Sequence, residues 1–417
     1  MRILISHQNF PGQFRHMAQA WAKQPGWQVL GLGRDTAPGL PPESGVRWVK
    51  YSLHRKPHVE QHQYLRQMEN AVLHGQAVAR ALIKLKQSGF TPDAILAHPG
   101  WGETLYAKDV FPNARLVHFC EWYYGQPGSD IDFDPEFPTS FDTRAKLRTW
   151  NALHNLNLEN CDAAVTPTRW QWQQHPEIYR SKIQVIHEGI DTDNLGPDPR
   201  AVLKLPNGHV VKAGEPVITY VARNLEPYRG FHVFMRALEQ IQKEHKTCHA
   251  VIVGGDDVSY GSKPADAPNW REKMLREVKL DPTRTHFLGK VPYDVYKKVL
   301  QVSKAHVYLT YPFVLSWSML EAMASGGLVL GSKTAPVQEV LQDGVNGRLV
   351  DFFSPEDIAR QVIETLGMSA DAQRVLRLAA RSDVQERVCS HKGLRGFTSM
   401  LGLQAKVELR ASHSLVV

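Results

Sequence analysis

Cysteine is scarce in this chain of 417 residues, which contains only Cys120, Cys161, Cys248 and Cys389. The four stand far apart and form no Cys-x-x-Cys pair, so we expect neither a structural zinc site nor a disulfide framework. Long apolar runs are also missing, since none approaches the roughly 20 residues that a membrane-spanning helix needs. These absences predict a protein of a reducing compartment, located in the cytoplasm.

Motifs that read DNA or RNA are absent as well, and the charge balance is only moderately basic. Lys and Arg number 49 against 42 Asp and Glu, a formal net charge of +7. This excess is too diffuse to indicate a nucleic-acid partner, but it suits anionic small molecules or an anionic membrane surface. At the N-terminus, residues 3–5 are apolar and a polar stretch follows, which predicts a first β-strand and no signal peptide.

The length and the apolar content of 42% predict two domains with ordinary cores. Short apolar runs alternate with helical patterns, which is typical of parallel sheets covered on both faces. Strands are expected at residues 3–5, 29–32, 94–98, 115–120, 162–166 and 184–186, then at 217–222, 249–253, 285–288, 305–310, 328–330 and 347–350. The fold class is therefore α/β.

The domain boundary is expected between residues 192 and 216, a stretch rich in Pro, Gly, Asn and Asp with little periodicity. This gives an N-terminal domain of residues 1–192 and a second domain of residues 216–370. Residues 371–417 follow as helical, basic chain. Their last part, residues 407–417, is expected to be loosely held.

The most informative stretch is residues 308–327, where an apolar strand, a polar loop and a helix N-terminus follow one another. Free N–H groups and the positive end of the helix dipole make such a loop an anion site, here around Ser316, Trp317 and Ser318. Glu321 lies in the first turns of the helix, where its carboxylate could reach a ribose diol. An ordinary βα unit whose acid caps its own helix fits the same pattern.

Two arginines, Arg223 and Arg229, bracket a loop that follows the first strand of the second domain. Because Arg pairs bidentately with phosphate oxygens, the two together with the following helix N-terminus could hold a diphosphate. The alternative is a pair of surface arginines in a loop.

In the first domain, three positions follow predicted strands. Gly12 lies in the loop after residues 3–5, while His98 and Glu121 come at the ends of two later strands. Ligands of open α/β sheets bind at the carboxyl ends of strands, and glycine lets the backbone approach a ligand closely. For Gly12, a simple strand-to-helix turn is the alternative.

Two other segments are distinctive. Residues 47–86 are rich in Arg, Lys and His and predict a helix over 61–85 with one apolar and one basic face. That basic face is either a solvated surface or a contact with anionic lipid or a lipid-linked diphosphate. Residues 125–143 carry Asp130, Asp132 and Asp134 at alternate positions. Pro135 and Phe141 stand where a calcium loop needs Gly and Glu, so we expect a mobile polar loop without a metal.

Residues 320–326, Leu-Glu-Ala-Met-Ala-Ser-Gly, resemble the nucleotide-sugar signature of the family 4 glycosyltransferases. Glu321 matches the second Glu of that Glu-x7-Glu signature, whereas Phe313 replaces the first, which in the family usually touches the donor sugar. Other family-like segments occur in the right order at residues 187–191, 222–231, 251–255, 287–292, 334–340 and 343–347.

The resemblance implies the GT-B fold, two Rossmann-like domains facing across a cleft, with the C-terminal helix returning to the N-terminal domain. It implies retaining transfer from a nucleotide-diphosphate sugar to a glycan or lipid-linked acceptor, in cell-surface polysaccharide synthesis at the inner face of the membrane. No cofactor or obligatory metal is implied. Catalytic roles fall to Arg223, Arg229, His98 and Glu121, and donor binding to Gly12, Val291, Ser316, Trp317, Ser318 and Glu321, with Lys290 beside the base.

Two other functions fit the same residues. A nucleotide-sugar epimerase on this fold would use acid and base side chains on a single substrate. A catalytically silent subunit of a glycan-assembly complex would bind the donor without turnover, and Phe313 at the position of the first Glu favours it.

Overall fold

The computed structural model describes residues 1–403, which divide into two compact units. Unit 1 comprises Met1–Gly125, Ser140–Glu188 and residues 391–403, and unit 2 comprises Gln126–Thr139 and Gly189–Ser390. The segment 126–139 therefore belongs to unit 2 although unit 1 flanks it on both sides. The expectation for residues 407–417 lies outside the described residues.

Unit 1 is built on a seven-stranded sheet in which neighbouring strands are parallel, in the order β3-β2-β1-β4-β5-β6-β7. Its strands are β1 (Arg2–Ser6), β2 (Gln28–Arg34), β3 (Arg47–Tyr51), β4 (Ala94–Ala97), β5 (Arg115–Phe119), β6 (Ala163–Thr166) and β7 (Ile183–Val185). The sequence predicts all of them except β3. That strand lies at the sheet edge with only Tyr51 buried, so it has no apolar run.

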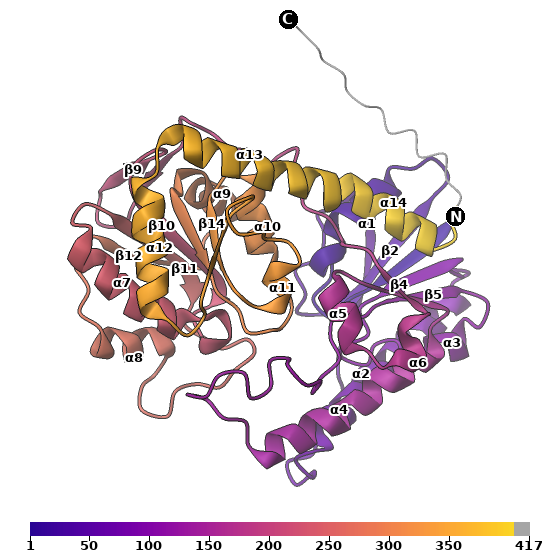
Figure 1. Cartoon of the computed structure of the whole chain (residues 1–417). Helices are drawn as coiled ribbons and strands as arrows, with labels where there is room; N and C mark the ends of the chain where they lie inside the picture. Colours follow the sequence, from indigo (N-terminus) through magenta and orange to yellow (C-terminus); the bar gives the residue numbers. More distant parts are fainter. Residues whose placement is uncertain (404–417) are drawn as a thin grey trace, which may run out of the picture. The chain divides into compact units, whose positions relative to one another are not determined.

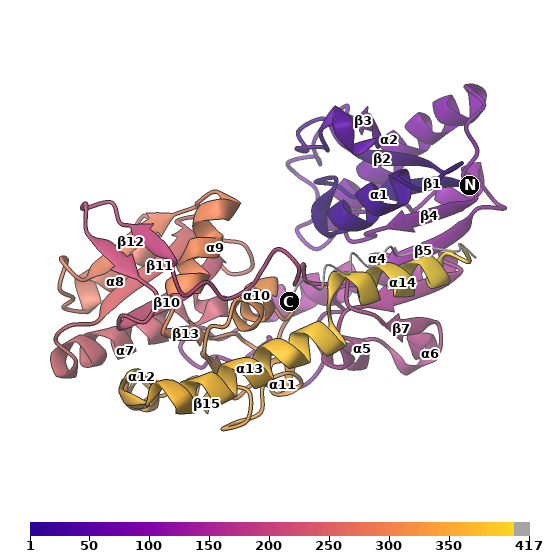
Figure 2. The same cartoon turned by 90° about the horizontal axis from the view of Figure 1, so that it is seen from above.

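Helices cover both faces of this sheet. They are α1 (Arg15–Ala22), α2 (Arg66–Gln87), α3 (Ala107–Val110), α4 (Phe141–Asn160), α5 (Arg169–Gln174), α6 (Glu177–Arg180) and α14 (Ser390–Met400). One core cluster joins Met17 of α1 and Phe397 of α14, and another contains Leu82 of α2 and Leu158 of α4. Figure 2 shows α1 alongside β2, which it contacts. Trp21 of α1 donates its indole N–H to Thr398 of α14 (2.9 Å), fixing these two helices together.

Unit 2 contains a six-stranded parallel sheet in the order β12-β11-β10-β13-β14-β15. Its strands are β10 (Val217–Asn224), β11 (His249–Gly255), β12 (Thr285–Gly289), β13 (Ala305–Tyr308), β14 (Val329–Ser332) and β15 (Arg348–Val350). The predicted strands are confirmed. Within the expected irregular linker, however, the structure forms a hairpin of β8 (Val202–Lys204) and β9 (Val210–Lys212), and Leu203 and Val211 enter the core of unit 2.

The helices of unit 2 are α7 (Phe231–Glu244), α8 (Trp270–Glu277), α9 (Tyr293–Val302), α10 (Trp317–Ala324), α11 (Ala335–Gln338), α12 (Pro355–Gly367) and α13 (Ala370–Arg387). Helices α7 and α12 lie side by side (Figure 1). Within residues 1–403, no helix combines the length and the apolar character needed to cross a membrane.

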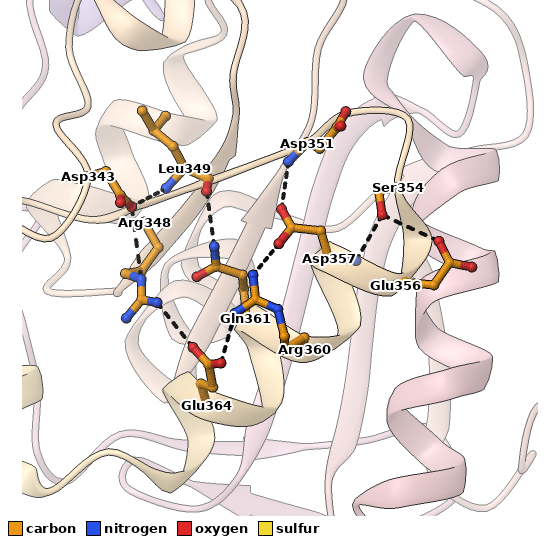
Figure 3. A network of polar contacts seen from close by, with 10 residues as sticks. All are labelled: Asp343, Arg348, Leu349, Asp351, Ser354, Glu356, Asp357, Arg360, Gln361 and Glu364. Carbon is orange, nitrogen blue, oxygen red and sulfur yellow. Dashed lines mark hydrogen bonds and ion pairs between the residues drawn. The ribbon is translucent and has the colours of Figure 1, made fainter.

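A chain of polar contacts joins the turn before β15 to α12 (Figure 3). Asp343 accepts a hydrogen bond from the Leu349 amide (2.8 Å) and lies 3.9 Å from Arg348. Arg348 pairs with Glu364 (3.1 Å), which also accepts from Arg360 (2.8 Å). Asp343, the first residue of the family-like segment 343–347, thus stabilises its own turn.

Candidate functional site

The loops after β10 and β13 meet at the carboxyl edge of the unit 2 sheet, because these two strands are neighbours. Arg229 joins them: its Nη1 donates to the Tyr308 hydroxyl (3.1 Å), to Thr310 Oγ1 (2.7 Å) and to the carbonyl of Val314 (3.0 Å). Its side chain is almost fully buried. A buried guanidinium bound to neutral oxygens keeps its full positive charge, so it makes this edge of the sheet electropositive.

Arg223 differs from Arg229 in its surroundings. It is exposed at the end of β10, and within residues 1–403 its side chain has no hydrogen bond or ion pair. An exposed guanidinium at the carboxyl end of a central parallel strand is free to bind an anion. The two arginines of the predicted pair therefore have different positions: Arg229 is buried in the edge and Arg223 is presented to solvent.

The N-terminus of α10 departs from the prediction in one respect. The amides of Ser316 and Ser318, expected to be open for an anion, are already bonded within the chain. The Ser316 amide donates to the Tyr308 hydroxyl (2.8 Å), and the Ser318 amide donates to the Ser316 Oγ that caps the helix (3.3 Å). An anion here would have to displace the long Ser318 contact, because a helix cap satisfies the same N–H groups that an anion uses.

Glu321 lies on α10 and faces α9. Its Oε2 accepts from the Tyr296 hydroxyl (2.6 Å) and its Oε1 accepts a longer bond from Tyr293 (3.3 Å). Burial raises the pKa of Glu321 above its ordinary value, and the two tyrosine bonds offset part of that rise. Tyr293 is exposed, and Glu321 itself is half-buried. The carboxylate is held in place from one side and can accept further donors on the other.

Two further predicted residues come after β12, at the same edge of the sheet. Lys290 is exposed and lies 3.9 Å from Asp257, and Val291 is half-buried against the core of unit 2. Phe313, at the position of the first family Glu, is buried with its ring centroid 5.1 Å from Tyr260 and 5.6 Å from Tyr228. An aromatic cluster thus occupies the place of a carboxylate.

Unit 1 brings its predicted residues together at the carboxyl ends of β1, β4 and β5. His98 is buried, stacks on Trp101 (4.4 Å) and points Nε2 to within 3.5 Å of the half-exposed Glu121 carboxylate. Gly12 has a φ of +50°, and a Cβ at this position would lie 2.5 Å from the His7 ring. A side chain at this position would be strained, and Gly12 packs against the His7 ring, which lies 5.4 Å from the His98 ring.

Sequence reasoning missed a buried polar cluster at the same edge. The Tyr51 hydroxyl donates to Glu103 Oε1 (2.9 Å) and lies 2.7 Å from His74 Nδ1. Glu103 is fully buried, and its Oε2 has no hydrogen-bond partner within residues 1–403. Burial raises the pKa of Glu103 to about 7 and lowers that of His74 to about 4. The three residues are far apart in sequence, so no local pattern marks them.

Glu103→Gln is expected to change how stability depends on pH. Native Glu103 holds its proton up to a pKa of about 7, whereas the unfolded chain releases it near 4.5. Wild-type stability attributable to this group therefore falls as pH rises through that window, by about 3 kcal/mol. The variant lacks this loss, so its stability relative to wild type rises from pH 4.5 to pH 7 in urea titrations. A constant difference across that range would contradict the assignment.

The loop at residues 125–143 also differs from the expectation. Its three aspartates do not converge: Asp130 accepts from Tyr228, Asp132 accepts from the Thr139 amide, and Asp134 accepts from Tyr311. Asp130 and Asp134 are buried. The prediction of a mobile polar loop is wrong for these residues, because both carboxylates are fixed on unit 2. Across residues 1–403 no cluster of His, Cys, Asp or Glu is arranged to hold a metal.

Two family models match this chain. Residues 25–195 match the model described as glycosyl transferase family 4 group, and residues 204–382 match the model described as glycosyl transferases group 1. Curated relatives include an uncharacterized glycosyltransferase of Methanocaldococcus jannaschii, 27% identical over 188 residues, and a D-inositol 3-phosphate glycosyltransferase of Corynebacterium kroppenstedtii, 25% identical over 188 residues. Each match covers 44% of this chain, and 43% and 40% of the respective relatives. The chain thus spans less than half the length of these relatives.

Solved structures resemble nearly the whole chain. A sucrose-phosphate synthase of Thermosynechococcus elongatus superimposes with a TM-score of 0.71 at 17% identity, covering 96% of this chain and 98% of that one. HepE of Anabaena, in complex with UDP and glucose, gives a TM-score of 0.68 at 17% identity, covering 96% and 99%.

Two Rossmann-like units of parallel sheet and helices, with such neighbours, define the GT-B fold. The two family models between them match most of both halves, and the chain belongs to the family 4 glycosyltransferases.

Proposed function

We propose that the protein is a retaining glycosyltransferase whose unit 2 binds a nucleotide-diphosphate sugar without a divalent cation. The observation that carries this proposal is the pair of arginines at the carboxyl edge of the unit 2 sheet. Arg229 is buried and joins the loops after β10 and β13, and Arg223 is exposed at the end of β10. Cationic groups at the carboxyl edge of a parallel sheet suit a diphosphate.

The chemistry assigned to these residues is charge stabilisation. Departure of the nucleotide builds negative charge on its diphosphate, and pre-positioned cations stabilise that charge without reorganisation. Arg223 contacts the phosphate oxygens and Arg229 supplies the field behind them. Glu321 accepts from the ribose hydroxyls, Lys290 and Val291 border the base, and Ser316, Trp317 and Ser318 lie beside the diphosphate. HepE, crystallised with UDP-glucose, supports a nucleotide-sugar donor.

The acceptor is a glycan or a lipid-linked sugar in cell-surface polysaccharide synthesis, and it binds unit 1 beside Gly12, His98 and Glu121. His98 with Glu121 forms a polar pair suited to sugar hydroxyls.

The exposed surface of helix α2 supports the proposal that the protein is cytoplasmic and contacts the inner face of the membrane. This surface carries Val72 and Ile83 among Arg80, Lys84 and Lys86. The apolar periodicity of residues 61–85 places Val72 on the core face of the predicted helix, and the structure corrects this because Val72 is exposed.

The test is a thermal-shift screen with UDP, GDP, ADP and their sugars in EDTA, followed by transfer assays with acceptor glycans and NMR of the product anomer. We expect one nucleotide family to stabilise the protein and its sugar to be transferred with the donor's configuration retained. Inversion would contradict retention. An absence of any stabilising nucleotide would contradict the donor site. Conversion of a nucleotide sugar without an acceptor would indicate an epimerase.

One observation favours a second candidate, a catalytically silent subunit of a glycan-assembly complex. Phe313 is enclosed by Tyr228 and Tyr260, so no carboxylate stands at this point. Nucleotide binding without transfer across a panel of donors and acceptors would support this candidate. A Phe313→Glu variant that gains donor hydrolysis would point the same way, whereas transfer by the wild-type protein excludes it.

A further inference from the structure

Residues 126–139, here called the strap, form part of unit 2 although residues on both sides of them belong to unit 1. The strap contains no helix or strand, yet two of its charged side chains are buried, with Asp130 4% and Asp134 3% exposed. Burying a carboxylate is costly unless hydrogen bonds compensate it. The contacts of these two aspartates therefore define where the strap lies.

Each buried carboxylate binds a tyrosine of unit 2. Asp130 Oδ2 accepts from the Tyr228 hydroxyl (2.8 Å), and Asp134 Oδ2 accepts from the Tyr311 hydroxyl (2.7 Å). Asp134 also lies 3.1 Å from Nε2 of buried His232. Burial alone would raise the pKa of Asp134, but the bonds from His232 and Tyr311 outweigh it and keep the pKa below its ordinary value. Asp134 is thus an ionised, fully bonded anchor.

Aromatic contacts and an outer ion pair complete the attachment. The Phe133 ring lies 5.2 Å from Tyr311 and 5.1 Å from Phe352, and the Phe137 ring lies 5.2 Å from Trp270. At the surface, Glu136 pairs with both terminal nitrogens of Arg236 (2.8 and 3.0 Å), which also binds Glu277. The Glu136 side chain therefore binds Arg236 and not Tyr228 or Tyr311.

The two tyrosines belong to the two loops that Arg229 joins. Tyr228 precedes Arg229 in the chain, and its carbonyl accepts from the Tyr311 amide (3.0 Å) while the two rings lie 4.7 Å apart. Tyr311 follows Thr310, whose hydroxyl accepts from Arg229. The strap therefore holds one residue on each of the two loops that Arg229 joins.

We propose that the strap is a positioning element for the donor site, in which Asp130 and Asp134 act through Tyr228 and Tyr311 to fix the two loops that Arg229 joins for a diphosphate. The proposal rests on the proposed donor site. Without these bonds the loops keep only the contacts of Arg229 and the backbone bond between Tyr311 and Tyr228, so part of the pre-organisation for the diphosphate is lost. Glu321 is held by α9 instead, so binding of the nucleoside part is unaffected.

The test compares Asp134→Ala and Asp130→Ala with Glu136→Ala, a matched control that removes a carboxylate from the same strap without touching a tyrosine. Calorimetric titrations in EDTA use UDP, GDP and ADP together with UMP, GMP and AMP. Each aspartate variant is expected to bind the diphosphate at least about tenfold more weakly, with monophosphate affinity changed less than about twofold. The Glu136 variant is expected to bind both as wild type does.

If an aspartate variant fails to fold, Tyr311→Phe replaces it in the test, because it deletes only one hydroxyl. This variant is also expected to bind the diphosphate more weakly while its monophosphate affinity stays nearly unchanged. The double variant Asp134→Ala with Tyr311→Phe should lose no more than Asp134→Ala alone, because Tyr311→Phe removes a bond that Asp134→Ala has already removed. Unchanged diphosphate affinity, or equal weakening of mono- and diphosphates, would overturn the strap's role. Wild-type protein that binds none of these nucleotides would overturn the donor site and the strap proposal together.

Discussion

Arg229→Ala is expected to eliminate measurable nucleotide-diphosphate binding and to lower the stability of unit 2. The substitution removes a buried charge and leaves the oxygens of Tyr308, Thr310 and Val314 without their donor. Losing such buried bonds costs about 3 kcal/mol or more, and the loss of electrostatic stabilisation lowers kcat/KM by about 100-fold or more. Thermal unfolding and steady-state transfer kinetics measure the two effects.

Arg223→Ala is the matched control for this result. Because Arg223 is exposed and unbonded within residues 1–403, its removal is expected to leave the melting temperature within about 1 °C of wild type while weakening diphosphate binding. Comparing the two variants thus distinguishes Arg229, a buried charge that supports the site, from Arg223, an exposed charge that contacts the phosphate. A folded Arg229→Ala protein with wild-type affinity would show that Arg229 is only structural.

Glu321→Gln is the second substitution with a large expected effect, and its signature is a pH profile. Burial raises the pKa of Glu321, so the carboxylate gains a proton at a higher pH than an exposed one does. A protonated carboxyl accepts poorly from a ribose diol, so wild-type nucleotide affinity should fall as pH decreases through that raised pKa. The Gln variant should bind about tenfold more weakly at neutral pH, and calorimetry from about pH 5 to about pH 8 should show that it lacks the part of the pH dependence that the carboxylate causes.

The pH dependence of folding stability should run opposite to that of nucleotide affinity: wild-type affinity increases with pH, whereas wild-type stability decreases with pH. Native Glu321 binds a proton more readily than the unfolded chain, so wild-type stability falls as pH rises from the ordinary pKa of 4.5 to the raised one. The Gln variant escapes this loss and should unfold at the same or a higher temperature at neutral pH. Tyr296→Phe serves as a control that keeps the carboxylate. A Gln variant with wild-type affinity and pH profile would exclude Glu321 from the site.

The alternation of strands and helices could be predicted from the sequence because buried parallel strands are apolar on both faces. Residues 217–222 and 305–310 were expected as strands, and their polar ends marked the candidate loops. The edge strand β3 and the β8–β9 hairpin were missed because each buries few side chains. Periodicity carries information only where one face or both faces enter a core.

The site could be predicted only in part, because several of its features depend on partners distant in sequence. Arg229 and Thr310 are 81 residues apart, and Asp134 and Tyr311 are 177 apart. The sequence marked Arg229 as basic and Asp134 as part of a polar loop, but not that both are buried. Glu103 likewise forms a buried polar cluster only with Tyr51 and His74, which are distant in sequence, and no local motif marks either of them.

The central claim is that the carboxyl edge of the unit 2 sheet binds a nucleotide diphosphate through Arg223 and Arg229 and without a metal. Calorimetric titration of the wild-type protein and Arg223→Ala with the stabilising nucleoside diphosphate, in EDTA and again in magnesium, tests it most directly. The account predicts saturable wild-type binding of equal strength in both buffers and at least about tenfold weaker binding by the variant. Binding that requires magnesium, or that survives unchanged in Arg223→Ala, would contradict it.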